Sequence, residues 1–131
     1  MPRYKGPAAD GVQTALHYGD GLNTPRDNAF RAAFKRKANR DVDVYAVQGY
    51  DAAQLLAAGV NAVKGDVGAR KDMFAAMSKA TIDSPRGTFT LSPSHNPVQD
   101  IYLREVKAGL NQVIGVAAKA LADPGTGCRM A

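Results

Sequence analysis

The chain has 131 residues, of which 45% are hydrophobic, and its formal net charge at pH 7 is +5. This length fits one domain with a moderate core, and the composition argues against disorder throughout the chain. No apolar run approaches the roughly 20 residues that cross a bilayer, and the first residues lack the apolar segment of a secretory signal. The chain is therefore expected to be cytoplasmic, or a mature or truncated piece of a longer protein.

A short strand and a first helix are predicted after a turn-rich lead-in at residues 1–10. The strand covers 11–18 and ends at a glycine-rich turn. Thr24 is a suitable N-cap for a helix that extends to about Ala38, since Pro25 fits the first helical position. Asp27 stands three residues after Thr24, as in a variant of the capping box.

Two further helices are predicted from apolar residues that recur with the helical period. The longer one covers about 44–64, with Asp43 as N-cap and Gly65 beyond its end. Gly59 lies within its apolar stripe, so we expect another element to approach closely there. Asp66 is the expected N-cap of the third helix, whose apolar face comprises Ala69, Met73, Ala76, Met77 and Ala80.

After residue 80 the periodicity changes to that of strands. Apolar and polar residues alternate over 88–91, and a polar loop follows at 92–99. Residues 100–107 and 111–120 are two further strand candidates, joined by a short turn. Residues 113–118 are apolar on both sides, which predicts a strand in the interior of a sheet. The expected fold class is α/β, with three helices followed by strands and a C-terminal hairpin.

The residues show no catalytic, metal or cofactor site. Neither His17 nor His95 has a partner at metal-ligand spacing, and the single cysteine, Cys128, has no neighbour that would lower its pKa. Ser84 and Ser94 are not set in a nucleophile motif, and no pair of carboxylates stands out. Arg86 is expected in a tight turn with its guanidinium exposed. The sequence therefore predicts a protein that is not an enzyme.

A cluster of basic residues lies on or just after the first helix. No aromatic residues alternate with these charges, as they would on a platform for stacking bases. A solvated helix face is therefore favoured over a nucleic-acid partner. The cluster comprises Arg31, Lys35, Arg36, Lys37 and Arg40.

Polar residues open the second helix, where they could face a ligand cleft. Considered alone, Gln48, Tyr50 and Asp51 fit an ordinary helix start better, because an acidic residue near the N-terminus complements the helix dipole.

Several strings together resemble one family. They are YAVQGYDAA (45–53), DSPRG (83–87) and HNPVQD (95–100), with GCRM (127–130) near the end. They are similar to the periplasmic substrate-binding proteins of ABC transporters for branched-chain amino acids, the leucine/isoleucine/valine-binding type. The likeness runs from about Gly6 to the last residue, but members of the family are more than twice as long. The chain therefore resembles only their C-terminal part.

The resemblance implies a partial type I periplasmic-binding-protein-like fold, in which residues 1–131 form one unit. The strand at 11–18 and the hairpin at 100–121 would belong to the second lobe, and the helices at 24–80 to the first. Residues 83–100 would form the crossover between the lobes. The segments that hold the ligand's charged groups in the family lie mostly before Gly6. Among cleft-edge residues, the resemblance selects Tyr45, Gln48, Tyr50 and Asp51 as ligand-binding candidates.

The resemblance also implies function, partners and location. The expected function is solute binding for an ABC transporter of branched-chain amino acids or related small carboxylates, aromatic acids included. Alternatives are a structural module that dimerises and binds no small ligand and, third, a basic nucleic-acid binder. The expected partners are the small ligand, a transporter permease in the full-length family, and a second copy of the chain, with or without exchanged strands. The family location is the periplasm.

Overall fold

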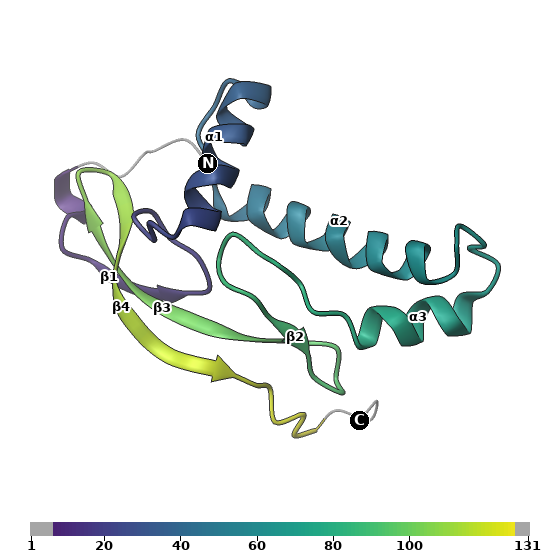
Figure 1. Ribbon diagram of the computed structural model, residues 1–131. Coiled ribbons are helices and arrows are strands. Elements are labelled where there is room, and N and C mark those ends of the chain that lie inside the picture. Colours follow the sequence, from purple (N-terminus) through teal and green to yellow (C-terminus); the bar gives the residue numbers. More distant parts are fainter. Residues whose placement is uncertain (1–6, 128–131) are drawn as a thin grey trace.

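A computed structural model describes residues 7–127 (Figure 1). The first six residues of the expected lead-in lie outside the described residues, and so do Cys128 and most of the string at 127–130. The described part of the lead-in contains a short 3-10 helix, η1, at Pro7–Ala9. No helix among residues 7–127 is long and apolar enough to cross a membrane.

Two of the three predicted helix starts are confirmed. Helix α1 spans Pro25–Ala38, and the Thr24 side chain accepts a hydrogen bond from the backbone N–H of Asp27. Helix α2 spans Val44–Ala62, and the Asp43 side chain accepts from the N–H of Ala46. Each cap satisfies a backbone donor that has no partner inside the helix.

The predicted start of the third helix is wrong. Helix α3 spans Arg70–Ser78 and begins after Ala69. The Asp66 carboxylate instead accepts from the N–H of Gly68, two residues on, and so closes a turn before the helix. Aspartate forms such turns readily because its short side chain reaches its own backbone. The prediction was right that the Asp66 side chain accepts from a nearby backbone N–H, but that N–H belongs to a turn and not to the helix.

Helices α2 and α3 form an antiparallel pair beside the sheet (Figure 1). Gly59 lies at their contact, as predicted. A Cβ atom placed on it would stand 2.7 Å from Cγ of Met77 and 2.9 Å from Cγ of Met73. Only a hydrogen at this position lets the two helices approach so closely.

The four strands form an antiparallel sheet centred on β3. Strand β3 spans Pro97–Lys107 and pairs with β1 (Gln13–Leu16), with β2 (Thr90–Leu91) and with β4 (Leu110–Leu121). Ala108 and Gly109 join β3 to β4, and both have positive φ angles, of 49° and 76°. That two-residue turn matches the right-handed twist of the hairpin.

Strand β4 corrects one prediction. Its apolar residues indicated a position inside the sheet, but β3 is the only strand that pairs with β4 among the described residues, and a short bridge from Asp20 to Gln112 covers only the start of its other side. Ile114, Val116 and Leu121 are about half exposed. Exposed apolar side chains on an edge strand leave both a hydrogen-bonding edge and an apolar surface open to further packing.

The core lies where the first two helices meet the end of β1. Tyr18, Val42 and Val47 are its buried residues, and Phe30 and Phe34 pack against them from α1. Ile82, Phe89, Tyr102 and Val106 are buried further along the chain. Large apolar side chains elsewhere, such as Leu56 on α2 and Phe74 on α3, are more than half exposed.

Candidate functional site

A buried ion pair joins α2 to the segment before β2. Nε of Arg86 donates to Oδ2 of Asp51 at 2.7 Å, and both side chains are 94% buried. The guanidinium carbon lies 4.3 Å from the centre of the Phe89 ring. Tyr102 of β3 donates its hydroxyl to the backbone carbonyl of Arg86 at 2.7 Å. The expectation of an exposed Arg86 is therefore wrong, because a carboxylate on α2 holds the side chain inside.

His17, just after β1, stands beside this pair. Its Nε2 lies 3.4 Å from Nε2 of Gln48, one turn before Asp51 on α2. Burial lowers the pKa of His17 to about 4, and the positive charges of Arg86 and Arg104 contribute, against an opposing effect of Asp51. His17 is therefore neutral at pH 7, so its Nε2 can accept from the Gln48 amide.

The four predicted ligand-binding residues do not form one cluster. Gln48 and Asp51 face His17 and Arg86. Tyr50 instead faces α1, where its hydroxyl accepts from Nη2 of Arg26 at 2.7 Å and its ring lies 4.8 Å from that of Phe30. Tyr45 is 57% exposed. The structure thus brings two of the four together. Their role in binding stays a prediction.

The basic cluster of α1 is not one uniform solvated face. Arg31 is only 26% exposed, and its Nε donates to Oδ2 of Asp27 at 2.9 Å. Its Nη1 lies 3.3 Å from Oδ1 of Asp20. Lys35 pairs with Asp41 at 3.1 Å. Two of the five charges are thus balanced by carboxylates within the chain, which weakens the case for a polyanion partner.

Asp27 has a different role from the predicted capping box. Its carboxylate accepts from the Tyr18 hydroxyl at 2.7 Å and from Arg31, and does not turn back to the N–H of Thr24. The side chain is 1% exposed. Burial and the hydrogen bond to Asp27 raise the pKa of Tyr18 far above its usual value. Asp27 therefore joins the first turn of α1 to Tyr18, just after the end of β1.

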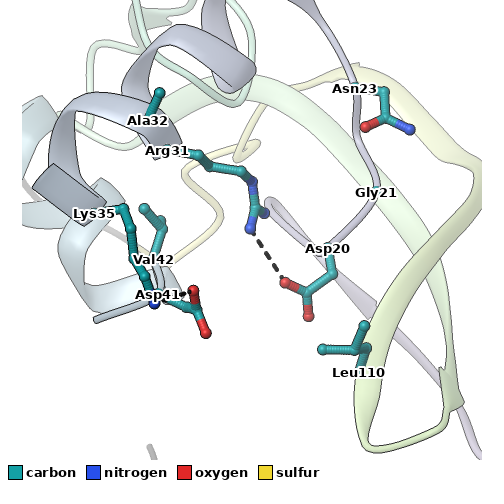
Figure 2. Close-up of a pocket in the computed structure, with 9 residues that line it drawn as sticks. All are labelled: Asp20, Gly21, Asn23, Arg31, Ala32, Lys35, Asp41, Val42 and Leu110. Atoms are coloured by element: carbon teal, nitrogen blue, oxygen red, sulfur yellow. Dashed lines mark hydrogen bonds and ion pairs between the residues drawn. The ribbon is translucent and has the colours of Figure 1, made fainter. Parts of the chain in front are cut away.

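A cavity of about 440 Å³ opens between α1 and the β3–β4 turn (Figure 2). Arg31 and Lys35 extend from α1 toward Asp20 and Asp41, so each cation on its wall already faces an anion. None of the four predicted ligand-binding residues lines it. The lining residues are Asp20, Gly21, Asn23, Arg31, Ala32, Lys35, Asp41, Val42 and Leu110.

Sequence reasoning missed His17 and Arg86 as members of a cluster. Arg86 and Asp51 are 35 positions apart, a separation at which no helix or strand period links two residues. In the sequence His17 is a lone histidine, 31 positions from the Gln48 side chain that it contacts. Across residues 7–127, no group of three or more His, Cys, Asp and Glu side chains could hold a metal ion.

Comparison with family models finds a match to the periplasmic binding protein family over residues 1–111. This family is a non-enzymatic component of transporters, as expected from the sequence. No curated protein matches the chain.

Solved structures extend the match. A solute-binding protein of an ABC transporter from R. palustris, in complex with benzoate, is 52% identical, with a TM-score of 0.89 over 95% of this chain and 34% of its own. A second, from Rhodopseudomonas palustris BisB5 in complex with 3,4-dihydroxybenzoic acid, is 30% identical, with a TM-score of 0.82 over 95% of this chain and 35% of its own. A leucine-binding protein from Thermotoga maritima is 19% identical, with a TM-score of 0.71 over 85% of this chain and 32% of its own.

These matches confirm the expected partial periplasmic-binding-protein fold. The leucine-binding protein shows the fold alone at its low identity, whereas the two more similar structures hold aromatic acids. The chain spans about a third of the length of these solved relatives. With the family model covering residues 1–111, the chain belongs to the periplasmic binding protein family.

Proposed function

We propose that this chain is part of the solute-binding component of an ABC transporter for aromatic carboxylic acids of the benzoate class. The observation that carries the proposal is the 52% identity, over 95% of the chain, to a solute-binding protein in complex with benzoate. Structures in complex with hydroxylated benzoic acids follow at 27–30% identity. The protein in complex with leucine is only 21% identical, which favours aromatic acids over branched-chain amino acids.

The fold divides into a group of strands and a group of helices, and this division supports the assignment of the chain to parts of two lobes. Strands contact strands, and α2 contacts α3, far more than any helix contacts any strand. We infer that the helices at 24–80 belong to the first lobe, and that the strand at 11–18 and the hairpin at 100–121 belong to the second. Residues 83–100 would then form a crossover. The Asp51–Arg86 pair lies between this crossover and α2, where a ligand cleft would open.

The complete protein would deliver its ligand to a transporter permease in the periplasm, as expected for this family. Gln48 and Asp51 are the cleft-edge residues that the geometry supports best, because they face other polar side chains. Tyr50 is held against α1 by Arg26, so we assign it a supporting role. Tyr45 is exposed and would contact the ligand only from the rim.

Calorimetric titration of the purified chain tests the ligand class. Benzoate and 4-hydroxybenzoate should bind saturably and at least about tenfold more tightly than L-leucine, a difference of about 1.4 kcal/mol. A preference for leucine would contradict the aromatic-acid assignment. If none of the three gives heat or a thermal shift, the chain does not bind these solutes by itself, and the structural module is then the better description.

A second copy of the chain is also proposed as a partner. After its bridge to Asp20 near Gln112, strand β4 has an open edge and half-exposed apolar side chains, and pairing with another copy would cover both. Light scattering at micromolar concentration should therefore report a dimer. A compact monomer would contradict this proposal without affecting the assignment of the ligand.

A further inference from the structure

The Asp51–Arg86 pair leaves part of a buried guanidinium unused. Arg86 reaches Asp51 through Nε only, a single contact, where two parallel hydrogen bonds are common for this type of pair. Its Nη1 and Nη2 make no hydrogen bond within residues 7–127, and they are not among the fully buried atoms without a partner, so they keep some contact with solvent. Oδ1 of Asp51 is buried and likewise lacks a partner among these residues. Buried polar groups without partners are uncommon, so the cluster is incomplete as it stands.

The charges around the cluster favour an anion. Arg104 donates from Nη1 to the carbonyl of Tyr18 and from Nη2 to the hydroxyl of Thr14, both neutral acceptors. The positive charges of Arg86 and Arg104 therefore both act on the region around His17, and the negative charge of Asp51 opposes them. Burial is the main cause of the lowered pKa of His17, and the charges of both guanidinium groups lower it further, against the opposing charge of Asp51. The planar donors of a guanidinium match the two oxygens of a carboxylate.

We propose that Arg86, His17 and Gln48 form a subsite for the carboxylate group of the bound solute. Nη1 and Nη2 of Arg86 carry the charge of the interaction, and the Gln48 amide and the neutral His17 ring add donors beside it. The Phe89 ring packs against the guanidinium, with its centre 4.3 Å from the guanidinium carbon. Asp51 acts as a positioning residue that orients Arg86 through Nε. This inference rests on the proposed function and assigns the end of the ligand that the chain would recognise.

Affinity measurements on variants test the subsite. Arg86→Lys keeps the positive charge opposite Asp51 but removes the planar pair of terminal amino groups, and it should weaken benzoate binding at least about tenfold. Gln48→Ala removes one exposed donor and should weaken binding by a factor of about three to ten. Gln54→Ala is the matched control, because Gln54 lies on the same helix but donates to the carbonyl of Asp83; it should leave affinity unchanged.

A spectroscopic measurement on the unmodified chain covers the case in which Arg86→Lys fails to fold. The ring NMR signals of His17 at pH 7 should shift on addition of benzoate and stay in place on addition of benzyl alcohol, which lacks the charge. His95, the other histidine, should not shift; the His95→Asn variant assigns the two sets of signals, and asparagine suits the positive φ of 63° at that position.

Three results would overturn the subsite. If benzoate binds and the Gln48→Ala and folded Arg86→Lys variants stay within about twofold of the unmodified chain, the subsite fails while the proposed function stands. If benzoate binds without moving the His17 signals, the carboxylate lies elsewhere. If benzoate at tens of millimolar neither binds nor moves the His17 signals, the subsite fails together with aromatic-acid binding by this chain.

Discussion

Replacement of Arg86 by methionine should lower the free energy of unfolding by about 3–5 kcal/mol. The change leaves the Asp51 carboxylate buried without its cation, and a buried charge without a partner is strongly unfavourable. It also removes the guanidinium that lies against the Phe89 ring. Urea denaturation followed by circular dichroism measures the effect, with the m-value compared to confirm that both chains unfold in the same way.

Two further variants separate the buried charge from other effects. The double variant Arg86→Met with Asp51→Leu removes both charges and should recover most of the loss, because an apolar pair of similar volume packs without a desolvation cost. Lys35→Met breaks the more exposed pair with Asp41, each side chain of which is more than half exposed, and should cost under about 1 kcal/mol. The account fails if Arg86→Met costs no more than Lys35→Met.

Removal of the Asp27 carboxylate should lower the free energy of unfolding by a similar amount. In Asp27→Ala the buried Tyr18 hydroxyl and the Nε of Arg31 lose their acceptor together, and we expect a loss of about 3–5 kcal/mol. Thermal unfolding measures the effect. Asp72→Ala is a suitable control, because Asp72 lies in the exposed first turn of α3 and contributes through the helix dipole, at most about 1 kcal/mol.

The same hydrogen bond makes stability depend on alkaline pH. Because the pKa of Tyr18 is raised in the folded chain, the unfolded tyrosine loses its proton first as the pH passes about 10. Above that pH the folded state holds more protons, so stability should fall as pH rises. Asp27→Ala should reduce this dependence, because the hydrogen bond to Asp27 contributes to the raised pKa. An equally steep decline in the variant would show that Tyr18 is not its source.

Local chemistry explains which parts of the fold could be predicted from the sequence. Thr24 and Asp43 cap α1 and α2 as expected, because an N-cap acts over three residues. Gly59 was identified because a glycine in an apolar helical stripe is disfavoured unless something lies against it. The prediction that Asp66 caps α3 was wrong because its side chain suits both a helix cap and a turn, and only the following residues decide between the two.

The candidate site depended on contacts that no local pattern encodes. Asp51 was selected through a family string, while its partner Arg86 was expected in solvent. Tyr50 was selected through the same string, yet Arg26 of α1 holds it away from Gln48 and Asp51. Strand β4 was expected inside a sheet because its residues are apolar, and periodicity cannot show whether a second neighbour is present. Each of these differences arises from tertiary contacts between distant segments.

The pairing of β1 with β3 has a consequence for the order of folding. Arg104 of β3 bonds to Thr14 of β1 across 90 positions, whereas α2 and α3 are neighbours in the chain. Closing so long a loop carries an entropic cost before any contact forms, and distant pairings slow folding. During synthesis, β1 leaves the ribosome long before β3 has been made. The residues of α2 and α3 are all made before those of β3, so the two helices can pair first. The last third of the chain therefore completes the sheet that the first residues begin.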